Sequence, residues 1–382
     1  MAARLLPGST GMRVRWAPEA AHRGSGFKPE IGGSCDLWLR HEGYVMTVLV
    51  TGAAGHLGGN LVQALLGQGR SVRVLIHRDR RAVQDLDVEI VQGDVRDLAG
   101  LKRAFQGCEV VYHLAAAISL GMKDWPWLDE VNVRGTRNVV QACLEAGVRR
   151  LIHVSSVHAL EQRPLGLPVD ERRPLADTAK DPPYVRSKAA ADKQVWKGIE
   201  RGLDAVILYP SGMIGPHDYK PSHFGEVLWA LARGKLPALV GGGYDWVDVR
   251  DVCQGAIRAE TTVGAGESVV LSGHWRSLPE LAATIEDLTK VRAPRLVVPR
   301  WLAKVGLPIA PLIFRLESGR SLYTRASLFA LRSNPQVSHG KATKVLGYRP
   351  RPIEHTLADT IRWFEHHAQT KARSNSRPTE RG

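Results

Sequence analysis

Two short segments carry residue types that could exchange a proton with a substrate oxygen. Ser155 and Ser156 follow the apolar residues 151–154, and Tyr184 lies four residues before Lys188. Residues four apart share one helical face, so the lysine ammonium is expected beside the tyrosine phenol. An unperturbed phenol has a pKa near ~10, and a neighbouring positive charge lowers it. The pattern predicts a tyrosine that works as a general acid or base near neutral pH.

A glycine run near the start of the chain could bind a phosphate group. Gly52, Gly55 and Gly58 follow the apolar residues 48–51 and precede the apolar-periodic residues 61–66. This spacing is typical of a turn from a buried strand into a helix whose first N–H groups face a pyrophosphate. Glycine-rich turns of this kind also occur without a ligand.

The end of the second predicted strand indicates which dinucleotide is bound. An acidic side chain there binds the ribose hydroxyls of NAD, whereas an arginine favours the 2′-phosphate of NADP. His77 and Arg78 follow the predicted strand 72–76, and Asp79 comes next. The first exit positions therefore favour NADP over NAD, with the carboxylate of Asp79 as a complication.

Asp94 and Val95 follow the third predicted strand, at residues 88–91. The Asp94 carboxylate could meet the adenine edge of a dinucleotide. The alternative is that it caps the helix expected from residue 98.

Short apolar strands alternate with amphipathic helices from residue 46 to residue 210. Such alternation is typical of βαβ units, which build a parallel sheet with its ligand at the carboxyl ends of the strands. We expect an α/β fold: a Rossmann doubly wound parallel sheet with a smaller C-terminal substrate lobe. The expected strands are 48–51, 72–76, 88–91, 110–114, 151–154 and 205–208, and the expected helices are 60–66, 98–105, 133–146, one from about 184, and 278–288.

Domain boundaries follow from where this alternation of strands and helices starts and stops. Residues 1–45 are rich in Gly, Pro, Arg and Ser without periodicity, which indicates a disordered leader or an over-extended start. The dinucleotide-binding domain is expected at 46–210, with return segments near 240–272. The substrate lobe is expected at 211–239 and 273–367, and a frayed basic tail at 368–382.

Composition narrows the classes of function. The net charge of +14 is spread along the chain without the aromatic interleaving of a nucleic-acid surface, so we expect no nucleic-acid partner. The four cysteines form no C-x-x-C pair, which argues against a metal site and a disulfide framework and for a reducing cytoplasm. The longest apolar run, residues 305–314, is shorter than the ~20 residues of a membrane span, so no transmembrane segment is expected. A core or dimer helix is favoured there over an amphipathic surface contact.

Eight motifs occur in one order along the chain: TGAAGHLGG (51–59), GDVRD (93–97), VYHLAA (111–116), NVRGT (132–136), VSS (154–156), YVRSK (184–188), YPSGMIGP (209–216) and VDVRDV (247–252). With this series the chain resembles an extended short-chain dehydrogenase/reductase. It is most similar to the dihydroflavonol-reductase-like and 3β-hydroxysteroid-dehydrogenase-like branch of the NAD-dependent epimerase/dehydratase family. The resemblance covers residues 47–364 and is specific for the family rather than for a substrate.

The resemblance implies roles for individual residues. Tyr184 would be the general acid/base, Lys188 would lower its pKa and hold the nicotinamide ribose, and Ser156 would donate a hydrogen bond to the substrate oxygen. Asn132 would support a water relay or stabilise its own helix. The residues implied or predicted to contact the NADP or NAD cofactor are Gly52, Gly55, His56, Leu57, Gly58, His77, Arg78, Asp94, Val95, Leu114, Ala115, Ala116, Pro210 and Ser211.

Departures from related subfamilies narrow the reaction. Sugar-nucleotide dehydratases carry Asp-Glu directly after the catalytic hydroxyl residue, where this chain has Val157 and His158. Epimerases continue into Val-Tyr-Gly, where this chain has Ala-Leu-Glu at 159–161. The sequence therefore favours a plain carbonyl reductase or secondary-alcohol dehydrogenase acting on a small molecule. Candidate substrate contacts are Ser119, Trp125 and His158, with Trp127 as part of an apolar lid; His158 could instead be a buried, backbone-bonded histidine.

Two other classes remain open. A sugar-nucleotide epimerase would need basic groups in the late lobe, for which Arg315, Arg320 and Arg325 are candidates, although solvent or a homodimer contact suits them equally. A nonenzymatic dinucleotide-binding sensor or assembly factor is the other class, and the intact Tyr184–Lys188 pair argues against it. Asp248 and Arg250 are expected to tie the two lobes together.

Overall fold

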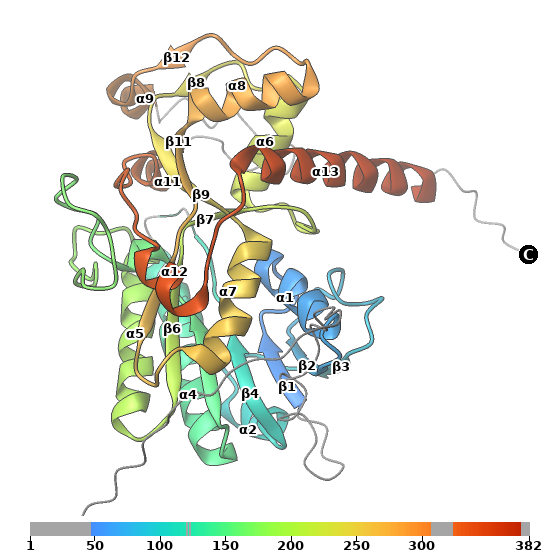
Figure 1. Cartoon of the computed structure of the whole chain (residues 1–382), viewed down its shortest axis with the longest axis vertical. Coiled ribbons are helices and arrows are strands. Elements are labelled where there is room, and N and C mark those ends of the chain that lie inside the picture. Colours follow the sequence, from blue (N-terminus) through green and yellow to red (C-terminus); the bar gives the residue numbers. More distant parts are fainter. Residues whose placement is uncertain (1–46, 120, 122–123, 307–323, 376–382) are drawn as a thin grey trace, which may run out of the picture. The chain divides into compact units, whose positions relative to one another are not determined.

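A seven-stranded parallel sheet forms the larger part of the computed structural model, which describes residues 47–119, 121, 124–306 and 324–375 (Figure 1). The strand order is β10-β6-β5-β4-β1-β2-β3, so the chain winds outward in both directions from β1 and β4. The elements of this domain are β1 (Thr47–Thr51), α1 (His56–Leu66), β2 (Ser71–Ile76), β3 (Glu89–Gln92), α2 (Leu98–Phe105), β4 (Cys108–His113), α3 (Trp125–Leu128), a π-helical turn (Asp129–Arg134), α4 (Gly135–Ala146), β5 (Arg150–Val154), a 3₁₀ turn (Val157–Ala159), α5 (Pro183–Glu200), β6 (Ala205–Pro210), α7 (Val249–Thr262), β10 (Ser268–Leu271) and α12 (Gly340–Leu346).

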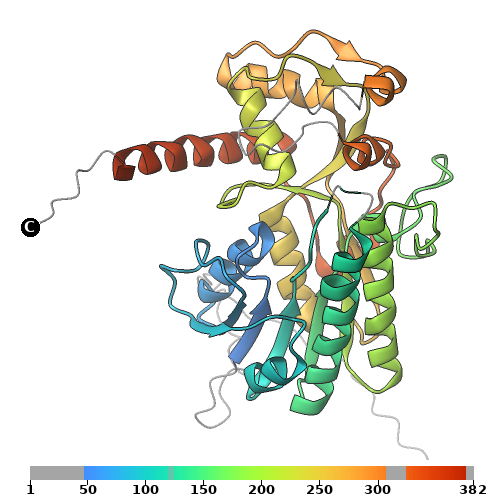
Figure 2. The ribbon, with the colours of Figure 1, turned by 180° about the vertical axis from the view of Figure 1, so that it is seen from behind.

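Helices cover both faces of this sheet because its strands are apolar on both sides. Along β1, Val48 and Val50 point into the core under α1, α7 and α12, whereas Leu49 points into the core under α2, α4 and α5. Figure 1 views the first face and Figure 2 the second. Burial on both faces explains why the strands read as short continuous apolar runs.

The smaller lobe has a core of its own. Its buried residues come mainly from α6, α8 and α13 and from β9, and Trp246 is its largest fully buried side chain. The elements of the lobe are β7 (Gly212–Ile214), α6 (His223–Ala232), β8 (Leu239–Val240), β9 (Gly243–Asp248), β11 (His274–Ser277), α8 (Leu278–Thr289), β12 (Val297–Val298), α9 (Arg300–Gly306), α11 (Arg325–Ala330) and α13 (Ile353–Asn375).

The predicted fold class is confirmed, and the six predicted strands lie within two residues of the observed ends. Most elements beyond β6 had no predicted counterpart, among them the edge strand β10 and the long helix α13. The expected frayed tail from residue 368 is wrong as far as residue 375. Helix α13 continues to Asn375 because no glycine or proline interrupts residues 353–375.

Several expectations concern residues that the structure does not describe. Others concern cysteines, membrane-spanning helices and metal sites among the residues that it does describe. The proposed leader, Cys35, Arg315, Arg320 and most of the apolar run 305–314 lie outside. Cys108, Cys143 and Cys253 are buried free thiols. Within the described part of the chain, no helix is long and apolar enough to cross a membrane, and no cluster of His, Cys, Asp or Glu could hold a metal ion.

Candidate active site

A cavity of about 840 Å³ opens at the carboxyl ends of the parallel strands and extends into the smaller lobe. This is where a doubly wound sheet binds its ligands. The cavity is lined by each residue predicted to catalyse or to contact the cofactor, and by two of the three predicted substrate contacts, Ser119 and His158. The fold therefore brings these residues together around one space, while their roles stay predictions.

The glycine turn fits a dinucleotide phosphate. The Gly55 N–H donates to the Gly52 carbonyl at 3.0 Å, which closes the turn, and Gly52 has a φ of +71° that side chains rarely adopt. A Cβ on Gly58 would lie 2.2 Å from the Gly52 oxygen, so only glycine lets α1 pack this closely. Helix α1 starts with no capping side chain and no acidic residue in its first turn. Its first N–H groups are therefore available to an anion.

The exit of β2 is rich in positive charge. Asp79 pairs with Arg81 at 2.6 Å, and Asp94 pairs with Arg96 at 2.7 Å, so both carboxylates are held by arginines and their pKa values lie below the usual range. His77 contacts Asp94 at 3.3 Å. Arg78 is exposed, lines the cavity and makes no ion pair with the described residues. An arginine side chain is thus available at the position that distinguishes NADP from NAD.

One of the two predictions for Asp94 is wrong. Asp97, not Asp94, occupies the residue before α2, and the Asp94 carboxylate accepts from the backbone N–H of Arg96 at 2.9 Å. The chain makes a tight turn at Asp94 before the helix starts, so its side chain cannot reach the helix N–H groups. Asp94 lines the cavity together with Val95, as the adenine-side prediction requires.

Ser156 and Tyr184 both line the cavity, and the Ser156 side chain lies near enough to the phenol to lower the pKa of Tyr184. Strand β5 ends at Val154, and Ser156 follows two residues later. Pro182 precedes α5 and Pro183 begins it, so Tyr184 lies in the first turn of the helix. Ser155 also lines the cavity, but its hydroxyl donates to buried Asp192 at 2.9 Å. The two serine hydroxyls therefore have different neighbours, and Ser156 is the one beside the phenol.

Lys188 lies one helical turn beyond Tyr184, as the spacing predicts. Its Nζ donates to the Val154 carbonyl at 2.9 Å, at the end of β5. Burial lowers the pKa of Lys188 to about 8, while the charge of Asp192 acts to raise it. Burial also raises the pKa of Tyr184 to about 12, which the hydrogen bond from Ser156 partly offsets. The expected lowering of the Tyr184 pKa is thus outweighed by desolvation, and in this state the phenol is a proton donor.

Asp192 is a residue that the sequence analysis missed. It is buried beneath the site, where it accepts from Ser155 and contacts the Nε2 of His153 at 3.2 Å. Burial raises its pKa, and Lys188 opposes that shift. The spacing 184, 188, 192 puts all three side chains on one face of α5, which is the signal that could have revealed it.

Asn132 fastens the loop after β4 to the start of α5. Its side chain accepts from Ala117 N at 2.7 Å, donates to Ala117 O at 3.0 Å, and donates to Ser187 Oγ at 2.9 Å. Ser187 in turn donates to the Tyr184 carbonyl at 2.7 Å. Asn132 lies in the π-helical turn, a local widening that is frequent at functional sites. Its contacts position the backbone that carries Tyr184.

His158 and Tyr244 form a hydrogen-bonded pair between the His158 Nε2 and the Tyr244 hydroxyl. Both side chains are buried and line the cavity, and burial lowers the pKa of His158 to about 4, so its ring is neutral. The prediction that His158 bonds to backbone is wrong, because its ring bonds to a side chain. Tyr244 was missed by the sequence analysis, although it alternates with Trp246 on one face of β9.

The remaining substrate candidates differ in position. Ser119 lines the cavity and its hydroxyl donates to Asp124. Trp125 does not line the cavity, and its ring faces the Arg186 guanidinium at 4.3 Å, so the geometry does not favour it as a substrate contact. Trp127, two residues further along the same short helix, lines the cavity in its place.

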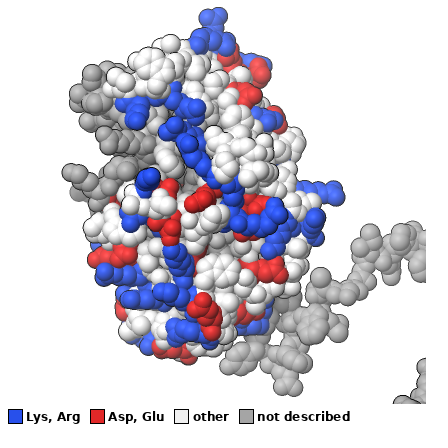
Figure 3. All heavy atoms as spheres, turned by 90° about the vertical axis from the view of Figure 1, so that its left-hand side faces the viewer, with Lys and Arg blue, Asp and Glu red and all other residues white. Residues whose placement is uncertain are grey.

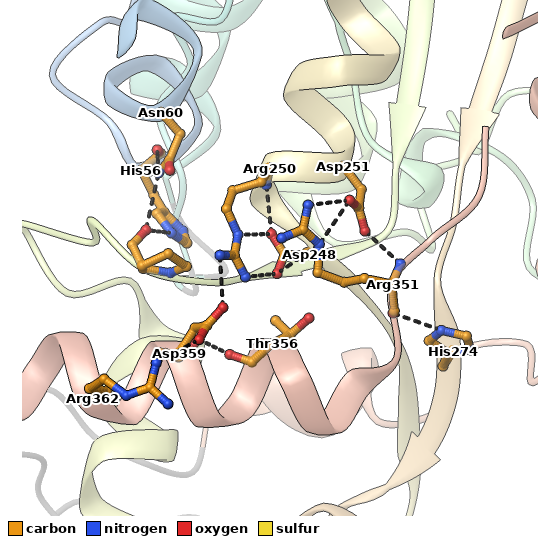
Figure 4. Close-up of polar contacts among 12 residues, drawn as sticks. His56, Asn60, Asp248, Arg250, Asp251, His274, Arg351, Thr356, Asp359 and Arg362 are labelled. Atoms are coloured by element: carbon orange, nitrogen blue, oxygen red, sulfur yellow. Dashed lines mark hydrogen bonds and ion pairs between the residues drawn. The ribbon is translucent and has the colours of Figure 1, made fainter. Parts of the chain in front are cut away.

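Polar contacts connect the small lobe to the dinucleotide domain (Figure 4). His56 and Asn60 of α1 both donate to the carbonyl of Pro216, at 3.0 and 3.1 Å. Arg250 of α7 binds Asp248 at 2.7 Å and Asp359 of α13 at 2.8 Å. These contacts join the small lobe to α1 and α7 of the dinucleotide domain.

The parallel sheet, the glycine turn and the Ser-Tyr-Lys arrangement define an extended short-chain dehydrogenase/reductase. The chain belongs to the NAD-dependent epimerase/dehydratase family, whose family model matches residues 48–272. The family and the relatives below indicate an NAD-dependent enzyme of the oxidoreductase or epimerase type.

Known proteins resemble the chain over most of its length. It is 35% identical over 323 residues to sterol demethylase protein B of Methylococcus capsulatus, covering 84% of this chain and 98% of the relative. It is 33% identical over 341 residues to a putative dihydroflavonol 4-reductase of Synechocystis, covering 84% and 95%. The crystal structure of gox2253 superposes with a TM-score of 0.74 at 33% identity, covering 85% of this chain and 99% of that one. A UDP-glucuronic acid 4-epimerase of Bacillus cereus, solved with NAD, is 19% identical and shows the fold alone.

Proposed function

We propose that the protein is an NADP-preferring oxidoreductase that interconverts an apolar ketone or aldehyde and the corresponding alcohol. The observation that carries the proposal is a single cavity lined by Ser156, Tyr184 and Lys188 together with two chemically different sets of residues. One half is lined by the glycine turn and the β2 exit. The other half is lined by apolar side chains of the small lobe: Phe224, Val227, Leu236, Leu239, Leu278, Phe329 and Leu331.

The residues of the site support one assignment of roles. A bound nicotinamide would supply or accept the hydride, with the glycine turn holding its pyrophosphate and Lys188 its ribose. In the direction of reduction, Tyr184 donates its phenolic proton to the carbonyl oxygen. Ser156 hydrogen bonds to the same oxygen, an interaction that strengthens as negative charge develops there. In the reverse direction, Tyr184 accepts the alcohol proton.

The lining of the small lobe favours an apolar substrate over a sugar nucleotide. A diphosphate needs positive partners, and among the described residues from 211 onward that line the cavity, Lys220 supplies the one Lys or Arg side chain. Arg325, a candidate for that role, is the first residue of α11. The relative named for sterol demethylation supports an apolar substrate class.

His158 and Tyr244 would orient the substrate. If the neutral histidine carries its proton on Nε2, it donates to the Tyr244 oxygen, and the Tyr244 hydroxyl is then free to donate in turn. The Nδ1 of His158 is buried without a hydrogen-bond partner. In this tautomer Nδ1 is an acceptor, and an unpaired buried acceptor is less unusual than an unpaired buried N–H donor. Tyr244 would offer a second donor to a substrate oxygen, close to Tyr184.

Turnover of a substrate panel tests the proposal. The absorbance of NADPH and NADH is followed with polycyclic and aromatic ketones, with aldehydes, and with UDP-sugars under the same conditions. We expect oxidation of NADPH by an apolar ketone and no change in any UDP-sugar by product analysis. Conversion of a UDP-sugar into its epimer without turnover of any carbonyl compound would contradict the proposal.

A further inference from the structure

The segment 290–306 presents large apolar side chains to solvent. Leu296, Trp301 and Val305 are 63%, 68% and 69% exposed, and Val297 and Leu302 are also exposed. They lie on β12 and α9 and the adjoining backbone, close together in sequence. Contiguous exposed apolar groups of this kind mark interaction sites rather than ordinary surface.

The same segment is basic. Between Lys290 and Gly306 the sequence KVRAPRLVVPRWLAKVG contains no acidic residue. Its basic residues, all exposed, are Lys290, Arg292, Arg295, Arg300 and Lys304. Arg295 pairs with Glu286 at 2.8 Å, and Arg300 donates to the Leu331 carbonyl at 3.3 Å. The others make no ion pair with the described residues, so their charge is available to an anionic partner.

Charges of both signs lie on the side of the molecule that carries α9. The face in Figure 3, seen from the side where α9 and α11 lie in Figure 1, carries Lys and Arg in a broken band with Asp and Glu among them. A nucleic acid would leave the exposed tryptophan and aliphatic side chains without a partner. An acidic, apolar surface satisfies both properties of the segment, and an anionic lipid bilayer offers headgroup charge above an apolar interior.

The segment also forms the outer side of the cavity wall. Strand β12 pairs with β8 through Val297–Leu239 and Val298–Val240, and both β8 residues line the cavity. Arg300 bonds to the carbonyl of Leu331, which lines the cavity as well. Figures 1 and 2 agree that α8, β8, β12 and α9 lie together at the end of the lobe away from the large sheet.

We propose that residues 290–306 dock the protein on an anionic lipid bilayer, with Trp301, Leu302 and Val305 inserted at the interface and the basic side chains against the headgroups. Docking there would bring the apolar half of the cavity next to apolar substrate dissolved in the bilayer. That link to substrate entry rests on the proposed function, whereas lipid binding itself does not.

Cosedimentation with vesicles tests the docking without any substrate. We expect the protein to sediment with vesicles of phosphatidylcholine mixed with phosphatidylglycerol and to stay in solution with phosphatidylcholine alone. At about 1 kcal/mol per basic residue near the surface, Arg292→Glu with Lys304→Glu should weaken binding about 30-fold or more. Trp301→Ser with Val305→Ser should weaken binding to the same vesicles because the inserted area is lost.

A matched control separates local from overall charge. Arg103→Glu with Lys197→Glu makes the same change in net charge on exposed positions of α2 and α5 and should leave vesicle binding nearly unchanged. Equal loss in this control, or no binding of the parent to the mixed vesicles, would overturn the proposal. Light scattering that shows a dimer, converted to monomers by Trp301→Ser with Val305→Ser, would identify the surface as a contact between two copies instead. Vesicle binding with no carbonyl turnover would refute only the proposed function.

Discussion

Lys188 combines a charged amine with a buried position, and this makes its charge sensitive to pH. Its pKa is lowered to about 8, so the ammonium is complete below pH 7 and is lost as the pH rises through 8. If the charged form is required, kcat/KM for carbonyl reduction should be flat at lower pH and fall about tenfold per pH unit above 8. A pH profile of the parent enzyme measures this directly, and a flat profile from pH 7 to 10 would contradict it.

Asp192 should influence the pH at which kcat/KM falls. Its negative charge raises the pKa of Lys188, so Asp192→Asn should shift the fall in kcat/KM to lower pH while keeping an acceptor for the Ser155 hydroxyl. The same pH profile, recorded for the variant, tests this positioning role. An unchanged midpoint with reduced activity would mean that Asp192 acts only on packing.

We predict that cofactor preference depends on Arg78. The parent protein should bind NADPH more tightly than NADH, and Arg78→Ala should reduce that ratio by about tenfold, as expected for the loss of a charge-assisted contact to phosphate. Fluorescence titration with both dinucleotides gives the ratio, with Arg103→Ala as a control on an exposed helix position. Equal affinities in the parent, or a preference for NADH, would refute the NADP assignment.

At the residue scale, sequence spacing predicted the contacts made within one element or at strand ends. Tyr184 and Lys188 share a helix face, and Ser156 follows a strand, so local geometry was sufficient. Tyr244 could not be placed beside His158 in the same way, since 86 positions separate them and only the packing of the two lobes unites them. The shifted pKa of Tyr184 was missed for the same reason: desolvation depends on what surrounds the side chain.

Helix α1 has a glycine near each end, and close packing requires only the first of them. Gly58→Ala should destabilise the protein by about 2 kcal/mol and weaken dinucleotide binding, because its Cβ would lie 2.2 Å from the Gly52 carbonyl. Gly67→Ala, at the other end, has an ordinary α-helical φ of −61° and contacts no closer than 3.4 Å. It should be neutral or stabilising by about 0.5 kcal/mol. Urea unfolding and NADPH titration of both variants measure this, and equal behaviour would contradict the packing role of Gly58.

Elements with strong local signals were predictable, and elements that depend on distant partners were not. Apolar runs and helix periodicity gave β1 to β6 nearly to the residue. Strand β10 is four residues long and has its place because it pairs with β6, from Ser268–Ile207 to Leu271–Pro210. The π-helical turn at 129–134 has no sequence signature, since its widened geometry accompanies the contacts of Asn132.

An ionic cluster around Asp248 helps to join the two lobes of the molecule. The Asp248 side chain is fully buried, and Arg250 binds it while also reaching Asp359. Arg250→Ala would leave a buried carboxylate short of partners and should lower the free energy of unfolding by about 2–3 kcal/mol. Arg362→Ala removes an exposed partner of Asp359 and should cost less than about 0.5 kcal/mol. Denaturant unfolding of both variants is the measurement, and equal losses would contradict a specific role for Arg250.

The sequence predicted a second lobe and the role of Asp248 and Arg250 between the lobes. The sequence did not predict the shape of the cavity between the two lobes or the residues that line it. Those residues come from separate segments of the lobe and become neighbours only after folding, so the proposed substrate class could not be reached from the sequence alone.

The central claim is that Tyr184 exchanges the proton of a carbonyl reaction, and one variant tests it most directly. Steady-state kinetics of Tyr184→Phe with NADPH and the best ketone of the panel should show turnover reduced by roughly 10²–10⁴-fold. Dinucleotide affinity, titrated on the same sample, should stay close to that of the parent because the ring is retained. Full activity in Tyr184→Phe would contradict the account and would mean that the Ser-Tyr-Lys arrangement is not the catalytic machinery of this protein.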